Sequence, residues 1–347
     1  MTSFWKKKQF WGTLIALVLL AYCLKDITLE ELKSLGARLN FYYVIPAAAS
    51  GFLYMLFKGL RWRAMVSRQK KIRFWRAITL YSTGQILGLV MPALTGQVGR
   101  LVLFSRKEGL KKTFIFSTII LEVLFDAISL VIFMLITSFA FVFPSEYRHM
   151  STIVAGVTVA ALVCLYLMLH YQEGAENFGR KCLRNRWPGA YITVKKFIRS
   201  FTKGIEVLKS SQHMAGTMAL SLLSWGAHML VVWYLMKAFG LELPFAAAAV
   251  VMIINTIVLM VPITPGNAGT FEVAVSTSLA AFSVGRSDAV LFALALHIMD
   301  FIPIFVYSFY FLRLERQSIM DIKEEHEEDM VPDYIDEEGG FIGEDRI

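Results

Sequence analysis

Charged residues are scarce in this sequence, and the long runs without them are its first informative feature. Only 18% of the 347 residues are Asp, Glu, Lys or Arg, and 56% are hydrophobic, whereas soluble domains average about 25% charged and 45–50% apolar residues. The charge-poor blocks are roughly 15–30 residues long, enough to cross a bilayer as a helix. This composition excludes a soluble enzyme, a secreted disulfide scaffold and a disordered regulator. It predicts an all-α polytopic membrane protein.

Cysteine is equally rare. The three cysteines, Cys23, Cys164 and Cys182, have a spacing that fits neither a metal site nor a disulfide framework. The chain also lacks a metal-ligand cluster, a Ser–His–Asp series and a phosphate-cradling P-loop. We therefore predict no catalytic residue, no metal and no cofactor.

The formal net charge of +8 is divided unevenly along the chain. Residues 321–347 contain 12 Asp or Glu and 2 Lys or Arg, so the other residues contain 33 basic and 15 acidic side chains. We predict a membrane domain over residues 1–320 and a disordered, acidic cytoplasmic tail over 321–347. The tail is either a solubilising end or a docking arm for a soluble partner.

The basic loops predict the topology, because Lys and Arg near membrane ends stay on the cytoplasmic side. Six spans are expected, at 10–24, 41–58, 113–143, 151–170, 214–236 and 289–312. Two further apolar blocks, 77–99 and 244–284, are broken by Pro and Gly and have the same kind of loop at both ends, basic for the first and weakly charged for the second. We interpret these blocks as re-entrant hairpins that enter from opposite faces of the cell (cytoplasmic or inner) membrane, with both termini cytoplasmic. The alternative is that each block makes ordinary kinked crossings, giving eight or more spans.

The two broken blocks share a motif. Residues 92–99 and 262–269 both read Pro, three residues, Gly, two residues, Gly, at an offset of 170. The same offset superposes neighbouring spans, which predicts half-repeats over about 10–143 and 151–312. Three crossings per half give the halves opposite orientations, an arrangement typical of transporters with broken helices near a central site.

A helix that restarts inside the membrane exposes backbone N–H groups and the positive end of its dipole, which favour an anion such as phosphate or carboxylate. The residues expected at these tips are Gly96, Gly99, Arg100, Pro265, Gly266, Gly269 and Glu272. The alternative is that the glycines only let helices pack closely.

Ionisable residues inside the spans are the next signal. Glu122 and Asp126 are four residues apart on one helix face, and His297 and Asp300 are three apart in the last span. Each costs on the order of 2.5–3.5 kcal/mol at a helix centre, so each is expected to face a cavity or a partner. The structural alternative is an ion pair with Arg100 or Lys58, and we interpret the isolated His228 as a packing residue.

The basic loop 171–213 contains one amphipathic segment. Apolar residues recur at steps of three and four between Tyr191 and Leu208, with Lys and Arg between them, up to Lys209. We predict a cytoplasmic helix over 191–209 that lies in the interface and attracts anionic lipid, or that packs on the bundle as a lid. A loop so close to the membrane does not favour nucleic acid as a partner.

The sequence up to about residue 315 resembles the lysylphosphatidylglycerol synthase transmembrane-region family, the flippase-like membrane domain. Residues 265–272 are similar to the family's P-G-G-x-G-x-x-E signature, with Asn267 in place of a glycine, and Arg61-Trp62 is similar to its Arg-Trp pair. Pro92, Gly96 and Arg100 match its first-half pattern, with Gln97 at the acidic position. Glu122 and Asp126 match its E-R-x2-x-D pattern, with Val123 replacing the arginine, and His297 lies near a position where the family often has arginine.

The resemblance implies a membrane module that moves a phospholipid or polyprenyl-linked lipid between leaflets, without the soluble aminoacyltransferase domain of fused members. Our hypothesis is a lipid translocase with a polar groove between the two hairpin tips. One alternative is a non-transporting membrane subunit that recruits a lipid-modifying (aminoacyl or glycosyl) transferase, and another is a secondary transporter of solutes or ions.

Overall fold

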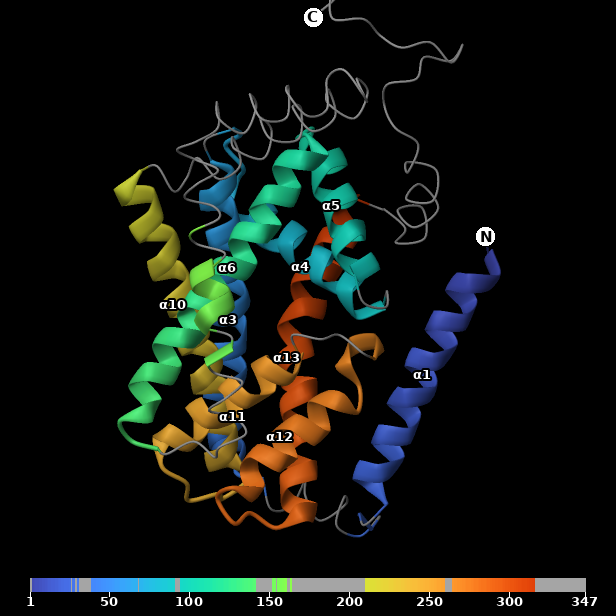
Figure 1. Cartoon of the computed structure of the whole chain (residues 1–347), viewed down its shortest axis with the longest axis vertical. Coiled ribbons are helices and arrows are strands. Elements are labelled where there is room, and N and C mark those ends of the chain that lie inside the picture. Colours follow the sequence, from blue (N-terminus) through green and yellow to red (C-terminus); the bar gives the residue numbers. More distant parts are fainter. Residues whose placement is uncertain are drawn as a thin grey trace, which may run out of the picture.

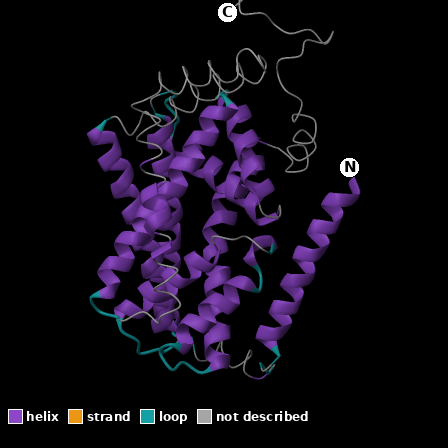
Figure 2. Cartoon of the chain, viewed as in Figure 1, coloured by secondary structure: helices purple, strands orange, loops and turns teal. Residues whose placement is uncertain are grey.

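The computed structural model of the chain describes residues 2–25, 39–67, 69–90, 94–141, 210–259 and 264–315, with a few isolated positions in 27–30 and 152–163. Every regular element in these ranges is a helix (Figure 2). In chain order they are α1 (Thr2–Leu24), α3 (Phe41–Val66), α4 (Phe74–Val90), α5 (Leu94–Glu108), α6 (Lys112–Ser138), α10 (Ser211–Ala238), α11 (Phe245–Leu259), the 3-10 helix η2 (Pro265–Asn267), α12 (Thr270–Ala280) and α13 (Arg286–Glu315). Helices are expected because they satisfy their own backbone groups without water.

Four of these helices are long and apolar enough to cross a membrane: α3, α6, α10 and α13. They coincide with the predicted spans 41–58, 113–143, 214–236 and 289–312, which confirms the all-α polytopic class. The apolar part of α1, Thr13–Leu24, is shorter. Most of segment 151–170, the predicted amphipathic helix at 191–209 and the acidic tail lie outside the described residues, so the total of six spans stays a prediction.

The first broken block folds as a helical hairpin. The Nε of Arg76, near the start of α4, donates to Oε1 of Glu108 at the end of α5 at 2.6 Å. The Lys70 ammonium lies 2.9 Å from the other oxygen of the same carboxylate. The two arms also pack against each other along their length. The joined ends show that α4 and α5 run in opposite directions. Residues 91–93, including Pro92, lie outside the described part of the chain.

The second broken block also folds back on itself. Ala247 and Ala248 near the start of α11 share an apolar cluster with Leu279 at the end of α12, so the outer ends of the two arms lie together. Figure 1 shows this hairpin at the opposite end of the molecule from α4 and α5. The two hairpins therefore enter the bundle from opposite ends.

The tips of the hairpins meet inside the bundle. The 3-10 helix η2 precedes α12 and contacts α4 of the other hairpin. A Cβ atom placed on Gly266 would lie 3.8 Å from the carbonyl oxygen of Leu89. This places the two interrupted segments in van der Waals contact.

The helix order repeats with inversion. α3 starts at residue 41 and α10 at residue 211, α4 at 74 and α11 at 245, and α6 at 112 and α13 at 286, so the offsets are 170, 171 and 174. α3 and α10 pack along each other in opposite directions, because the Asn40 amide at the start of α3 donates to the Ala238 carbonyl at the end of α10 at 2.9 Å. The helix pairs that touch in one half have counterparts that touch in the other. The helices from α3 to α6 and from α10 to α13 therefore repeat one order with the two sets inverted, while the half-repeat bounds of about 10–143 and 151–312 stay a prediction.

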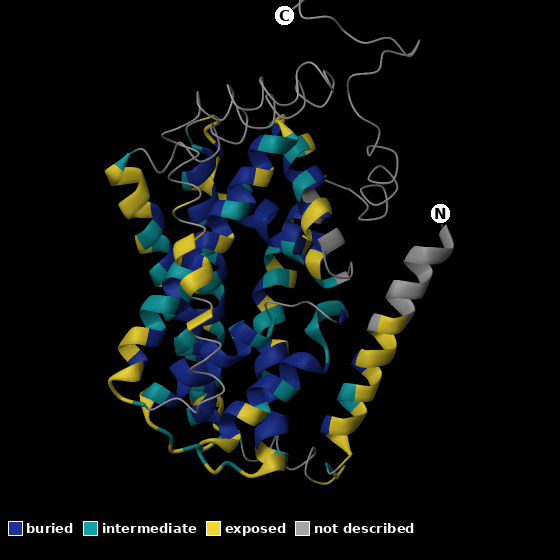
Figure 3. Ribbon diagram, in the orientation of Figure 1, coloured by how far each residue is buried: buried dark blue, intermediate teal, exposed yellow. Residues whose placement is uncertain are grey.

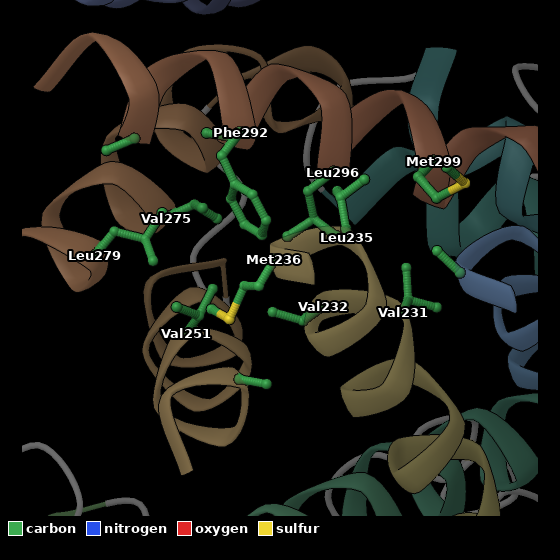
Figure 4. Close-up of a cluster of buried hydrophobic side chains, with 14 of the residues drawn as sticks. Val231, Val232, Leu235, Met236, Val251, Val275, Leu279, Phe292, Leu296 and Met299 are labelled. Atoms are coloured by element: carbon green, nitrogen blue, oxygen red, sulfur yellow. The ribbon is translucent and has the colours of Figure 1, made fainter. Parts of the chain in front are cut away.

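The core of the second half is a layer of aliphatic and aromatic side chains between α10, α11, α12 and α13. Figure 4 shows Val232, Leu235, Met236, Val275 and Phe292 converging there from different helices. Buried residues fill the centre of the bundle, while α1 shows mostly exposed positions (Figure 3). Within the described residues, α1 packs chiefly on α12 and η2, which makes it a peripheral helix beside the second hairpin tip.

Candidate functional site

Five charged side chains gather in the interior of the bundle where α3, α5 and α6 approach one another. We call them the cationic cluster: Lys58, Arg61, Arg100, Glu122 and Asp126. The side chain of Arg61 is fully buried and those of Arg100 and Glu122 are 4% and 7% exposed, whereas Lys58 is 12% and Asp126 22% exposed. Only the Lys58–Asp126 edge of the cluster therefore reaches the protein surface.

Asp126 is the acceptor for four donor groups. The Arg61 guanidinium donates in a forked arrangement, with Nη1 2.6 Å from Oδ1 and Nη2 3.1 Å from Oδ2. Lys58 Nζ lies 3.3 Å from Oδ2, and the indole Nε1 of Trp225 donates to Oδ1 at 2.8 Å. Asp126 is 14 residues from Lys112, the first residue of α6, so it lies about 21 Å along the helix. The carboxylate is thus placed at mid-span and neutralised there.

Glu122 lies one turn earlier on the same helix face and binds a second guanidinium. Arg100 donates to both Glu122 oxygens, and the Tyr81 hydroxyl donates to Oε1. Arg61 Nη2 lies 3.6 Å from the same oxygen, which links the two carboxylates through one arginine. Of the two predictions for these residues, the ion pair with Arg100 and Lys58 is the one that the structure contains.

The cluster has more positive than negative charge. Three cations face two carboxylates, which leaves one positive charge. The Nε atoms of Arg61 and Arg100 are also buried without a hydrogen-bond acceptor among the described residues. Buried polar groups nearly always find a partner. The two unpaired N–H groups and the excess charge together show that the cluster has unused capacity to donate hydrogen bonds to an anion.

Aromatic rings surround the cations. The Arg100 guanidinium lies 4.7 Å from the centre of the Tyr81 ring and 5.2 Å from that of Phe104. The Lys58 ammonium lies 5.0 Å from the ring centres of both Tyr54 and Trp225. Ring faces attract cations more strongly when water is excluded, so these contacts stabilise charge at a depth where hydration is lost.

The second half of the chain carries a different kind of pair. His228 Nε2 on α10 lies 3.1 and 3.2 Å from the two carboxylate oxygens of Asp300 on α13. The centre of the His228 ring lies 4.9 Å from that of Tyr54, at an interplanar angle of 34°, and the Tyr54 ring in turn lies under Lys58. His228, which the sequence assigns only to packing, therefore links the cationic cluster to Asp300.

The tip of the second hairpin holds a histidine and a carboxylate. His297 Nδ1 lies 2.7 Å from Glu272 Oε1, and His297 Nε2 lies 3.0 Å from the Gly266 carbonyl oxygen. The other Glu272 oxygen accepts the Gly269 amide at 2.7 Å. The imidazole stacks on the Phe271 ring, with ring centres 4.1 Å apart, and its centre lies 4.5 Å from that of the tilted Phe301 ring. This histidine ties α13 to both η2 and α12.

The glycines of the two motifs have distinct local roles. A Cβ on Gly96 would lie 2.5 Å from the Gly88 Cα, and one on Gly269 would lie 2.4 Å from the Leu19 Cβ of α1. Gly266 and Gly269 have φ values of 58° and 82°, which glycine adopts without strain. At the start of α12 the Gly269 amide is bonded to the chain's own Glu272, so this carboxylate occupies the position predicted for an external anion.

The structure thus brings most of the predicted site residues into two groups. The first group comprises Lys58, Arg61, Arg100, Glu122 and Asp126. The second comprises Gly266, Gly269, Glu272 and His297. Asp300 pairs with His228, which lies beside the first group. Gly99 is buried on α5, Gln97 is exposed, and Pro265 and Asn267 are half-buried at the tip. Pro92 lies outside the described residues.

Sequence reasoning missed four polar partners: Tyr81, Ser221, Trp225 and His228. Ser221 accepts from Arg61 Nη1 at 2.8 Å. The offset of 170 offered a signal for one of them, because it maps Lys58 onto His228. The two aromatic residues and the serine gave no signal, since such residues are ordinary in membrane helices.

Comparison with known proteins identifies the family. A family model described as the lysylphosphatidylglycerol synthase TM region matches residues 9–308. The UPF0104 membrane protein PH1989 of Pyrococcus horikoshii is 22% identical over 304 residues, which cover 82% of this chain and 90% of that protein. No solved structure matches the chain. The family model covers most of the sequence, and the chain accordingly belongs to the lysylphosphatidylglycerol synthase TM region family of integral membrane proteins.

Proposed function

We propose that this protein is a lipid translocase, which moves a phospholipid or polyprenyl-linked lipid between the two leaflets. The anionic head group passes the cationic cluster, while the acyl or prenyl chains stay in the bilayer. The family description names a lipid, lysylphosphatidylglycerol, and supports a lipid as the class of substrate.

The observation that carries the proposal is the unpaired donor capacity of the cationic cluster. A phosphate taken unaided into hydrocarbon loses its hydration at a cost of many kcal/mol. Among the described residues, Arg61 and Arg100 each keep one buried Nε–H without an acceptor, and the cluster has one positive charge in excess. Arginine binds phosphate by forked, charge-assisted hydrogen bonds. A phosphodiester oxygen supplies both the missing acceptor and the missing negative charge.

The arrangement of the polar groups supports movement across the bilayer. The two hairpins enter from opposite ends and meet at Gly266 and Leu89. Polar contacts run from Arg100 through Glu122, Arg61, Asp126 and Lys58, and then past Tyr54 to His228 and Asp300. Such a series replaces hydration in the interior of the bundle. Both inverted halves contribute to it, as expected of a path that is open alternately to each side.

A proteoliposome assay tests the proposal. Vesicles containing the purified full chain and a lipid labelled on its head group are exposed to a membrane-impermeant quencher. We expect the quenchable fraction to rise above the outer-leaflet value for the wild-type chain. Arg100→Gln should slow this process roughly 10- to 100-fold, because a charge-assisted hydrogen bond contributes about 1.5–3 kcal/mol. Arg73→Gln, at an exposed loop position before α4, is the matched control and should behave as wild type.

Further arms separate the rival functions. Arg100→Lys keeps the charge opposite Glu122 but removes Nε–H, so it should also be slow. Elution of a slow variant as a single species in size-exclusion chromatography shows that it is folded. Faster movement of anionic than of zwitterionic lipids, without competition from inorganic phosphate, supports the lipid as substrate. No gain in the quenchable fraction with any lipid contradicts the proposal. Flux of phosphate alone would make the protein a solute transporter, and co-purification of a soluble transferase without lipid movement would make it a recruiting subunit.

A further inference from the structure

The hydrogen bonds of His297 require a proton that a neutral histidine and an ionised glutamate do not hold. Nδ1 faces a Glu272 carboxylate oxygen at 2.7 Å, and Nε2 faces the Gly266 carbonyl oxygen at 3.0 Å. A carbonyl oxygen and an ionised carboxylate only accept hydrogen bonds, whereas a neutral imidazole has one donor and one acceptor nitrogen. Both contacts are satisfied only when His297 carries two protons, or when Glu272 is protonated and donates to Nδ1. Either way, the pair shares one additional proton.

His228 provides an internal contrast. Its Nε2 faces the Asp300 carboxylate, while its Nδ1 is buried without a partner among the described residues. A neutral ring with its hydrogen on Nε2 satisfies that geometry. The second half therefore contains one histidine that needs an extra proton and one that does not.

We propose that the His297–Glu272 pair is a proton-binding site, and that its proton holds the tip of the second hairpin against α13. When the proton leaves, one nitrogen of His297 presents a lone pair to an oxygen that also presents a lone pair. The contact to Glu272 or the contact to Gly266 then becomes repulsive. These two contacts join α13 to α12 and to η2, so their loss releases the tip. That release of the tip is a step in lipid movement rests on the proposed function.

Other charged and titratable groups reach the pair from the surrounding elements. The Cys23 thiol of α1 lies within electrostatic range of Glu272. Arg286 lies within electrostatic range of the same thiol. Asp300 is three residues along α13, paired with His228 of α10. From α4, Leu89 approaches Gly266 through its backbone carbonyl. Among the described residues, His297 is bonded to the Glu272 carboxylate and the Gly266 carbonyl oxygen, so we assign the shared proton to the pair itself.

Spectroscopy on the full chain in lipid nanodiscs tests the site without any transport measurement. Nitrogen NMR of histidine-labelled protein, with the His297 signal assigned by its loss in His297→Gln, reports how many ring nitrogens carry protons. Infrared difference spectra against Glu272→Gln report whether the carboxyl is protonated. At neutral pH we expect either a doubly protonated His297 or a protonated Glu272, and His228 with a single proton. A neutral His297 beside an ionised Glu272 would overturn the proposal.

Thiol labelling tests the release of the tip. Ala268→Cys, in a chain whose three native cysteines are replaced by serine, places a thiol at a half-buried tip position with an ordinary φ of −57°. Its labelling rate is divided by that of Glu242→Cys, an exposed site, which corrects for the chemistry of the thiolate. With Glu272 in place, we expect this ratio to rise at least several-fold as the pH is raised. When Glu272→Gln is added, the ratio should stay low at all pH values, because the amide group donates to Nδ1 of a neutral His297 as the protonated carboxyl does. A ratio independent of pH with Glu272 in place would overturn the release, whether or not the protein moves lipid.

Discussion

The two aspartates that lie deepest in the long helices, Asp126 and Asp300, have unequal surroundings. Asp126 on α6 accepts hydrogen bonds from three side chains, two of which are permanent cations. Asp300 on α13 faces a single imidazole. The partners of the two aspartates occupy equivalent positions, because Lys58 on α3 and His228 on α10 differ by the repeat offset of 170. The first half thus has a permanent cation where the second half has a histidine.

This difference predicts a ranking of two isosteric substitutions. Asp126→Asn leaves Lys58 without a counter-charge and Arg61 with only its 3.6 Å contact to Glu122, and should destabilise the protein by about 3–5 kcal/mol. Asp300→Asn keeps an oxygen that accepts from His228 Nε2, so it should cost only about 1 kcal/mol. Thermal unfolding of the detergent-solubilised variants measures both, and an equal or larger loss for Asp300→Asn would contradict the assignment of the two pairs.

For single residues, the sequence predicts the partners of charged side chains better than those of neutral polar side chains. Glu122 and Asp126 were predicted on one face with Arg100 and Lys58 as alternative partners, because a charge at mid-span needs a counter-charge. Tyr81 and Trp225 donate hydrogen bonds to the same carboxylates. They could not be predicted, since an aromatic residue in a membrane helix is stable whether or not its polar atom has a partner.

The helices of the first hairpin extend beyond the apolar block that predicted them. The expected segment was 77–99, whereas α4 and α5 together occupy 74–90 and 94–108. The additional turns contain Arg76 and Glu108, which bond to each other across the hairpin. A hydropathy pattern ends at the first charges, so it underestimates a helix whose terminal charges neutralise each other.

Two glycines in this hairpin provide a matched test of its tip. Gly96→Ala places a methyl group 2.5 Å from the Gly88 Cα, a backbone atom that cannot move without displacing α4. Gly88→Ala places a methyl group where nothing lies within 4 Å. We expect Gly96→Ala to destabilise the protein by about 1–3 kcal/mol, the usual cost of overpacking. Gly88→Ala should be neutral or stabilising by up to about 1 kcal/mol, because alanine favours the helix.

Thermal unfolding of these two alanine variants in the same detergent provides the comparison. If Gly88→Ala lowers the unfolding temperature more than Gly96→Ala does, then α4 and α5 do not approach each other closely at Gly96.

The packing of α1 depends on another glycine. Gly269 has a φ of 82°, and a Cβ there would lie 2.4 Å from Leu19 and 3.1 Å from the Ala16 carbonyl oxygen, both on α1. Gly240 has a similar φ of 68° but nothing within 4 Å of a Cβ. Both alanine substitutions therefore carry the backbone strain, about 1–2 kcal/mol, and only Gly269→Ala adds the collision with α1.

We expect Gly269→Ala to loosen α1 and Gly240→Ala to leave it in place. Cys23, which is 3% exposed on α1, is the natural reporter: in a chain with Cys164 and Cys182 replaced by serine, its reaction with a small thiol reagent should accelerate only in Gly269→Ala. Equal labelling of Cys23 in both variants would show that α1 does not rest on Gly269.

The whole molecule combines two inverted halves whose polar groups have diverged. The first half carries Lys58, Arg61 and Arg100, whose charge is permanent, and the second carries His228 and His297, whose charge depends on protons. The repeat itself could be predicted from the shared motif and the span offsets. The contact between the tips, at Gly266 and Leu89, could not, because the local pattern specifies that each helix is broken and not which surface the break faces.

The inverted arrangement predicts on which side of the membrane each hairpin begins. Lys71 and Lys111 are exposed at the two outer ends of the first hairpin, and Glu242 and Gly285 at those of the second. Single substitutions Lys71→Cys, Lys111→Cys, Glu242→Cys and Gly285→Cys are made in a chain whose native cysteines are replaced by serine. Because Lys and Arg crowd the loops around the first pair, the positive-inside rule places that pair in the cytoplasm. A membrane-impermeant maleimide added to intact cells should therefore label only the second pair, and all four positions after permeabilisation. Labelling of one member of either pair from outside but not the other would mean that the block between them crosses the membrane, and the two hairpins would then be ordinary kinked spans.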